Sequence, residues 1–129
     1  MEIRSIDTHI VGTPPPYHGG HNWVFLKLTT DTGIVGVGEC NWTEYRERAI
    51  VQLLEDLAEP FILGTDPFQI EDLRARLYRG SHFLHVPGPM HAQAIAAVEM
   101  ACWDIIGKHV GEPVYKLLGG EYNGKLRSY

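Results

Sequence analysis

The chain has 129 residues, of which 44% are hydrophobic and 21% charged, enough for one globular domain with a buried core. A net charge of −5 and a pI near 5.7 argue against a nucleic-acid partner, which would favour a basic surface. The apolar runs are too short to span a membrane, and a complete (β/α)8 barrel, which needs about 250 residues, does not fit.

Alternating apolar residues predict an antiparallel β-meander in the first 40 positions. Glu2–Val11 and Trp23–Thr30 have the pattern of strands, and a turn at positions 31–33 leads into a third strand at Ile34–Glu39. Between the first two strands, the Pro- and Gly-rich segment Gly12–Asn22 is typical of a loop. In the third strand Gly36 and Gly38 leave one face without side chains, so another backbone can approach it closely.

After Cys40 the hydrophobic period changes from 2 to 3.6, which indicates helices. Thr43 is the expected N-cap of a first helix that ends at Pro60. Glu44 and Glu47 lie near the positive end of this helix, where a negative charge is favourable. A capping-box pattern, Asp66-Pro67-Phe68-Gln69, predicts a second helix that ends near Gly80.

The longest predicted helix runs over Met90–His109, and a short helix follows Pro113 before the double glycine at positions 119 and 120. Strands come first and helices after, without βαβ alternation. This order predicts an α+β fold, a three-stranded meander followed by a helical bundle, with no internal domain boundary.

Few residues in the chain suit catalysis. Two histidine pairs, His18 with His21 and His82 with His85, fall in predicted loops without nearby Cys-x-x-Cys or acidic clusters, so we expect hydrogen-bonding histidines rather than a metal site. A substrate-facing role for them stays open. Glu99 is not spaced to pair with another carboxylate on its helix, and we expect it and Asp104 to be structural. No nucleophile signature is present, so the sequence predicts no catalytic residue and no metal ligand.

The two cysteines, Cys40 and Cys102, allow at most one disulfide. The N-terminus has no signal-peptide pattern. We therefore expect reduced thiols and a cytoplasmic protein.

Three segments carry a resemblance to a known family. They are WVFLKLTTDTGIVGVGE at 23–39, GTDPFQIEDL at 64–73 and AIAAVEMACWDIIGKHVGEPVYKLLGG at 94–120. In this order they resemble the N-terminal capping domain of the mandelate racemase/muconate lactonizing branch of the enolase superfamily. Cys102 departs from the Leu or Ala more usual at its position, a change that a core tolerates.

The resemblance implies a division of labour between two domains. Residues 1–124 would form the capping domain, and 125–129 would start the segment that leads into a (β/α)8 barrel absent from this chain. In such enzymes the barrel binds Mg2+ on carboxylates, and a Lys or His removes the proton α to a substrate carboxylate. The 129-residue chain alone would then be inactive.

The resemblance also implies that two loops, Gly12–Asn22 and Cys40–Tyr45, reach over the active site. Their candidate substrate-binding residues are Tyr17, His18, His21, Trp42 and Glu44. Such polar groups suit a polyhydroxylated acid, so an aldonate-type acid-sugar dehydratase is expected. Expected partners are a small carboxylate substrate, the barrel domain and further copies of the chain. A racemase, a cycloisomerase and a catalytically inactive stand-alone binding domain are the alternatives.

Overall fold

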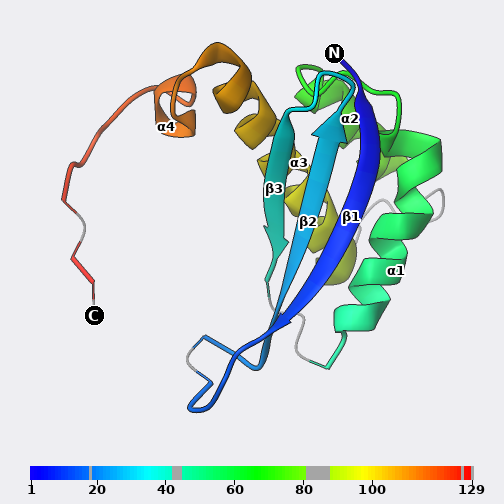
Figure 1. Cartoon of the computed structure of the whole chain (residues 1–129), viewed down its shortest axis with the longest axis vertical. Coiled ribbons are helices and arrows are strands. Elements are labelled where there is room, and N and C mark those ends of the chain that lie inside the picture. Colours follow the sequence, from blue (N-terminus) through cyan, green and yellow to red (C-terminus); the bar gives the residue numbers. More distant parts are fainter. Residues whose placement is uncertain (18, 42–44, 81–87, 126, 129) are drawn as a thin grey trace.

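The structure is a computed structural model that describes residues 1–17, 19–41, 45–80, 88–125 and 127–128 (Figure 1). Its sheet has three antiparallel strands in the order β1-β2-β3. They are β1 (Ile3–Gly12), β2 (Asn22–Thr30) and β3 (Val35–Cys40). Each predicted strand boundary is therefore correct to within one residue.

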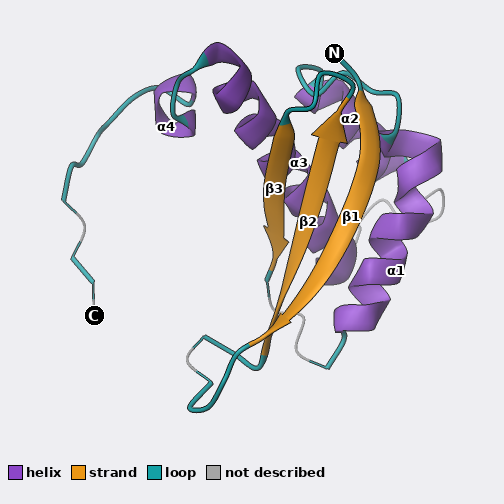
Figure 2. Cartoon of the chain, viewed as in Figure 1, coloured by secondary structure: helices purple, strands orange, loops and turns teal. Residues whose placement is uncertain are grey.

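Helices follow the sheet, which confirms the α+β prediction (Figure 2). They are α1 (Glu47–Leu57), the π-helical turn η1 (Ala58–Ile62), α2 (Ile70–Arg79), α3 (Pro89–Val110) and α4 (Val114–Leu117). The long helix α3 crosses behind the sheet, while α1 runs along the β1 side. A chain of this length, folded in this way, contains no (β/α)8 barrel.

One face of the sheet lies on the hydrophobic core. Val24, Leu26 and Leu28 of β2 are fully buried, while the residues between them are half-buried, as period-2 alternation requires. The core continues into the apolar stripes of the helices. Their buried side chains are Ile50, Leu54, Leu57, Ile70, Leu73, Leu77, Ala94, Ile95, Ala97, Val98, Ala101, Cys102, Ile105 and Ile106.

The close approach expected at the glycines of β3 is present. A Cβ atom on Gly38 would overlap the carbonyl oxygen of Ala97 in α3, and one on Gly36 would overlap that of Ala101. Because the strand has glycine and the helix has alanine at these positions, α3 lies directly on β3.

A carboxylate fastens α3 to β3. Asp104 Oδ2 accepts a hydrogen bond from the backbone N–H of Val37 at 2.9 Å and lies 2.6 Å from Lys108 Nζ. Lys108 Nζ in turn donates to the Val35 carbonyl at 2.7 Å. This arrangement confirms that Asp104 is structural. Its partners are the edge strand β3 and a lysine of its own helix.

The first helix differs from its prediction at both ends. It begins at Glu47, with Arg46 in the N-cap position and no side-chain cap. Thr43, the expected N-cap, lies outside the described residues. Pro60 does not end the helical path, because it lies inside η1, where Leu63 N–H bonds to the Ala58 carbonyl five residues back. The wider π turn accommodates a residue without an N–H.

The start of α2 also differs. The capping-box pattern predicted a helix from Pro67, but α2 begins at Ile70. Asp66 Oδ1 accepts the Phe68 N–H at 3.0 Å, and the Gln69 N–H bonds to the Asp66 carbonyl at 2.9 Å. Asp66 therefore forms a tight turn ahead of the helix, a use of Asp that competes with capping.

Helix α3 agrees with its prediction to within one residue. Pro89 stands at its first position, and Gly111, with a φ of 73°, ends it in the left-handed conformation. Among the described residues, no helix combines the length and apolar character needed to cross a bilayer.

Candidate substrate-facing loops

The two loops of interest lie at one end of the molecule. β1 and β3 finish there and β2 begins there, so the β1–β2 loop and the segment that joins β3 to α1 emerge at the same edge (Figure 1). The β1–β2 loop projects beyond the sheet. The fold thus brings together the two segments in which substrate-facing residues were predicted.

Hydrogen bonds within the β1–β2 loop, and one from β2, shape the loop. The Thr13 N–H bonds to the His21 carbonyl at 2.8 Å, and the Trp23 indole N–H donates to Thr13 Oγ1 at 2.8 Å. The tip turns back through a bond from the Gly20 N–H to the Tyr17 carbonyl at 3.0 Å. The indole also covers Gly19, where a Cβ would come within 2.5 Å of a ring carbon. The Trp23 side chain thus packs against the loop at Gly19 and bonds to it at Thr13.

Three aromatic rings from the two loops form a cluster, which we call the ring cluster: Tyr17, His21 and Tyr45. The His21 and Tyr17 ring centroids are 4.4 Å apart with a 32° tilt, and those of His21 and Tyr45 are 6.4 Å apart with a 40° tilt. Tyr17 is 44% exposed and Tyr45 is 87% exposed. The ring cluster therefore presents hydroxyl and imidazole groups to the outside.

Tyrosine adopts an uncommon backbone conformation twice in this site. Tyr17 has a φ of 61° and Tyr45 a φ of 63°, both in the left-handed region that L side chains rarely occupy. Such a conformation costs free energy unless surrounding contacts hold it. At Tyr45, the backbone N–H finds a partner in Glu47 Oε1 at 3.2 Å.

Glu47 connects the two loops. The same Oε1 atom accepts a hydrogen bond from Asn22 Nδ2 at 3.0 Å, so it joins the end of the first loop to the last residues before α1. Bonds from its own backbone N–H, from Asn22 and from the Tyr45 N–H, together with the nearby His21, hold the pKa of the Glu47 carboxyl below its usual range.

The structure places two of the five predicted substrate-binding residues, Tyr17 and His21, in contact with each other. The other three, His18, Trp42 and Glu44, lie outside the described residues. Sequence reasoning missed Tyr45 and the link between Asn22 and Glu47. The only available signal was that Asn22 is the last residue of the first predicted loop and Tyr45 the last residue of the second. Glu47 had been interpreted as a negative charge favourable to the start of the helix.

Metal-binding groups do not gather among the described residues. There, no cluster of three or more His, Cys, Asp or Glu side chains could hold a metal ion. Cys40 and Cys102 are buried free thiols, as expected, and burial raises their pKa values to about 11 and about 12. They stay protonated near neutral pH and are poor nucleophiles. The pair His82 and His85 lies outside the described residues.

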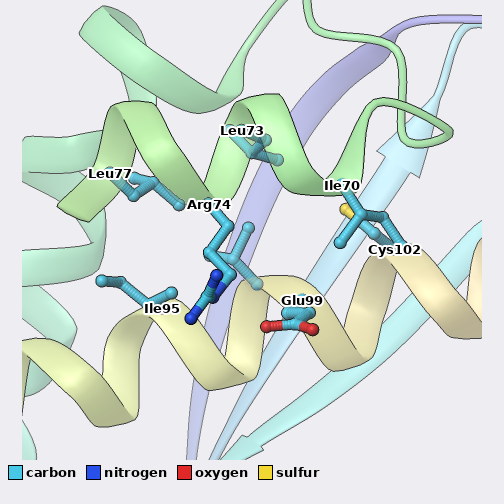
Figure 3. Close-up of a pocket in the computed structure, with 8 residues that line it drawn as sticks. Ile70, Leu73, Arg74, Leu77, Ile95, Glu99 and Cys102 are labelled. Atoms are coloured by element: carbon cyan, nitrogen blue, oxygen red, sulfur yellow. The ribbon is translucent and has the colours of Figure 1, made fainter. Parts of the chain in front are cut away.

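A small hollow between α2 and α3 is lined by apolar side chains with Arg74 and Glu99 at its rim (Figure 3). Its volume of about 10 Å³ has room for one water molecule at most. It does not suit an organic ligand.

Known proteins share the sequence and fold of this chain. Residues 17–119 match the mandelate racemase/muconate lactonizing enzyme N-terminal domain. A D-mannonate dehydratase of Caulobacter vibrioides is 45% identical over 118 residues, which cover 92% of this chain and 28% of that protein. A D-galactonate dehydratase family member of Pseudarthrobacter chlorophenolicus is 44% identical over 129 residues, covering 100% of this chain and 29% of that protein.

Solved structures agree with the sequence relatives. A mandelate racemase/muconate lactonizing enzyme from Sulfitobacter sp. superposes with a TM-score of 0.88 at 38% identity, covering 95% of this chain and 31% of that one. The chain thus spans less than a third of the length of each of these relatives. With the match over residues 17–119 and the shared fold, it belongs to the mandelate racemase/muconate lactonizing enzyme N-terminal domain family.

Proposed function

We propose that this chain is the capping and substrate-specificity domain of an acid-sugar dehydratase of the enolase superfamily. Residues 1–124 form the capping domain, and residues 125–129 lead into a barrel that removes the proton α to the substrate carboxylate. The relatives named as D-mannonate and D-galactonate dehydratases support the choice of substrate class.

One observation carries the assignment of the site: the ring cluster stands exposed at the end of the fold where both loops emerge. Phenol and imidazole groups donate and accept hydrogen bonds, and they offer flat faces on which a sugar chain can lie. Two loops whose only task was to connect strands and a helix would not need three such rings.

We assign the candidate residues Tyr17, His18, His21, Trp42 and Glu44 to the hydroxyls distal to the substrate carboxylate, and add Tyr45 to them. Contacts with the remote part of a substrate orient its reacting end and keep water out. They supply no proton transfer. Binding without proton transfer suits the phenol and imidazole groups at the loop end, which donate and accept hydrogen bonds.

The remaining machinery is assigned to the barrel. The described residues of this chain offer no suitable metal-ligand set, so the Mg2+ expected for this superfamily does not fit here. We further propose that the whole enzyme is a cytoplasmic homo-oligomer. Intact mass of the native protein, with sedimentation of the purified enzyme, tests the barrel and the assembly.

Specificity is tested in the protein made from the complete reading frame. His18→Ala and His21→Ala are assayed singly for kcat/KM over a panel of C5 and C6 sugar acids, with mandelate and muconate added to detect racemase or cycloisomerase activity. His9→Ala is the control, because His9 is an exposed histidine in β1, outside both loops.

We expect dehydration of at least one sugar acid, an altered substrate ranking in the two loop variants, and an unchanged ranking in the control. Turnover of mandelate or muconate alone would replace the dehydratase assignment by one of the alternatives. The same ranking and rates in both loop variants would reject the role of the loops.

A further inference from the structure

We propose that Glu47 is the positioning residue of the substrate-facing end: by accepting hydrogen bonds from both loops, it sets the ring cluster in one arrangement. The inference rests on the proposed function, since it names the residue that orders the site assigned there. Glu47 itself is given no contact with the substrate.

The geometry supports a link between the loops rather than a local contact. Glu47 Oε1 accepts from Asn22 Nδ2 at 3.0 Å and from the Tyr45 N–H at 3.2 Å. Asn22 follows His21 directly, and Tyr45 contributes a ring, so the two bonds end next to two members of the ring cluster. One oxygen atom thereby fixes the separation between rings that come from different loops.

The backbone conformation of Tyr45 explains why a hydrogen bond to Glu47 is needed there. Tyr45 has a φ of 63°, which a tyrosine adopts only when other interactions compensate for it. The bond from its N–H to Glu47 is such an interaction. Without it, Tyr45 can relax to a negative φ, which would swing its ring away from His21 and open the ring cluster.

A simpler role for Glu47 is that of a negative charge in the first turn of α1, where it faces the positive end of the helix dipole. The two roles make different demands on the side chain. The dipole role needs a charge and is lost in Glu47→Gln. The positioning role needs an acceptor oxygen at the same reach, which glutamine keeps and alanine removes.

The experiment compares Glu47→Ala, Glu47→Gln and Asn22→Ala in the protein made from the complete reading frame. Glu55→Ala is the control, since it removes a carboxylate from the exposed part of the same helix. Hydrogen–deuterium exchange is measured on peptides that contain Thr13 to Trp23 and Tyr45 to Ile50. Steady-state kinetics on the preferred sugar acid are measured alongside.

Glu47→Ala should speed exchange in both peptides and raise KM for the sugar acid about tenfold, with a smaller change in kcat, as expected for the loss of two hydrogen bonds. Asn22→Ala should speed exchange in the first peptide. Glu47→Gln and the control should stay within about twofold of the wild type in KM and should keep its exchange pattern, because the acceptor oxygen remains.

Two results would overturn the proposal: exchange in Glu47→Ala that matches the wild type, or a Glu47→Gln variant as impaired as Glu47→Ala. The first means that Glu47 does not hold the loops, and the second that only its charge matters. A wild type that turns over no sugar acid would contradict the proposed function, while the exchange data would still decide the role of Glu47.

Discussion

Gly38 of β3 leaves no room for a side chain between the sheet and α3. A Cβ atom there would overlap the Ala97 carbonyl oxygen, which belongs to the backbone of α3 and cannot rotate away. We predict that Gly38→Ala lowers the free energy of unfolding by about 1–3 kcal/mol, the usual cost of overpacking a tight contact. Urea unfolding followed by far-UV circular dichroism measures the change.

Gly88→Ala provides the matched control for that substitution. Gly88 precedes α3 with a negative φ of −51°, and a Cβ there would meet no atom within 4 Å. Alanine should leave stability nearly unchanged at this position. Equal losses in the two variants would contradict a special role for the close approach of α3 to β3, because chain entropy alone would make alanine stabilising at both positions.

The lowered pKa of Glu47 predicts that the free energy of unfolding depends on pH. Its pKa in the folded chain lies below the value of 4.5 expected without the fold, so the unfolded state takes up a proton first as the pH falls. The stabilisation is complete well above pH 4.5 and is lost as the pH falls through the folded pKa. We predict that the advantage of wild type over Glu47→Gln in urea unfolding is present at pH 7 and shrinks towards pH 3.

For this comparison, Glu55→Gln accounts for the loss of one negative charge elsewhere on α1. A difference between wild type and Glu47→Gln that stays constant from pH 7 to pH 3 would contradict the link between the carboxylate and its three hydrogen-bond donors.

The residues of the site show what a sequence could and could not predict. Tyr17 and His21 became candidates because the family resemblance implies that their loop reaches over the active site, where their rings are polar groups. Glu47 was read only as a charge at a helix start, because its partner Asn22 is 25 residues away and nothing in the local pattern joins them. The left-handed backbone of Tyr45 was equally hidden, because sequence patterns suggest glycine or asparagine for such positions.

At the scale of elements, α3 and β3 are joined by the side chain of Asp104. Its carboxylate accepts the Val37 N–H, and its own exposed fraction is 32%. We predict that Asp104→Ala costs about 1 kcal/mol in the free energy of unfolding, since it removes a charged acceptor from a backbone donor and separates Lys108 from its partner. Amide exchange at Val37 should become faster.

Glu71→Ala is the corresponding control on α2, where the pair with Arg74 spans 3.5 Å and Glu71 is 84% exposed. Such a surface pair contributes little, so its loss should change stability by a few tenths of a kcal/mol. A loss at Asp104 no larger than this would mean that the strand holds its position without the carboxylate.

Elements with a strong hydrophobic period were predictable, and those set by local capping signals were not. The strands and α3 have long regular patterns that tertiary contacts reinforce. The boundaries at Pro60 and Asp66 failed because each residue has two uses. Pro60 fits within a π turn, and the Asp66 side chain closes a turn ahead of α2. Ile62 and Ile70, which lie beside these two turns, are both buried in the core.

At the scale of the whole molecule, the proposed function leaves proton abstraction to a barrel outside this chain. We predict that a polypeptide that ends at Tyr129 shows no turnover of any sugar acid, with or without added Mg2+. The protein from the complete reading frame should be active under the same conditions. Dehydration or racemisation by the 129-residue polypeptide, purified to a confirmed mass, would contradict this prediction.

The hydrogen bonds at Glu47 also bear on how this domain could be re-engineered. Its two loops start from separate strands, which invites the exchange of one loop at a time between relatives. Because Asn22 and Tyr45 share one acceptor oxygen, a transplanted first loop would meet a second loop shaped for a different neighbour. Chimaeras should therefore exchange the segments 13–22 and 41–47 together, so that both loops and Glu47 come from the same protein.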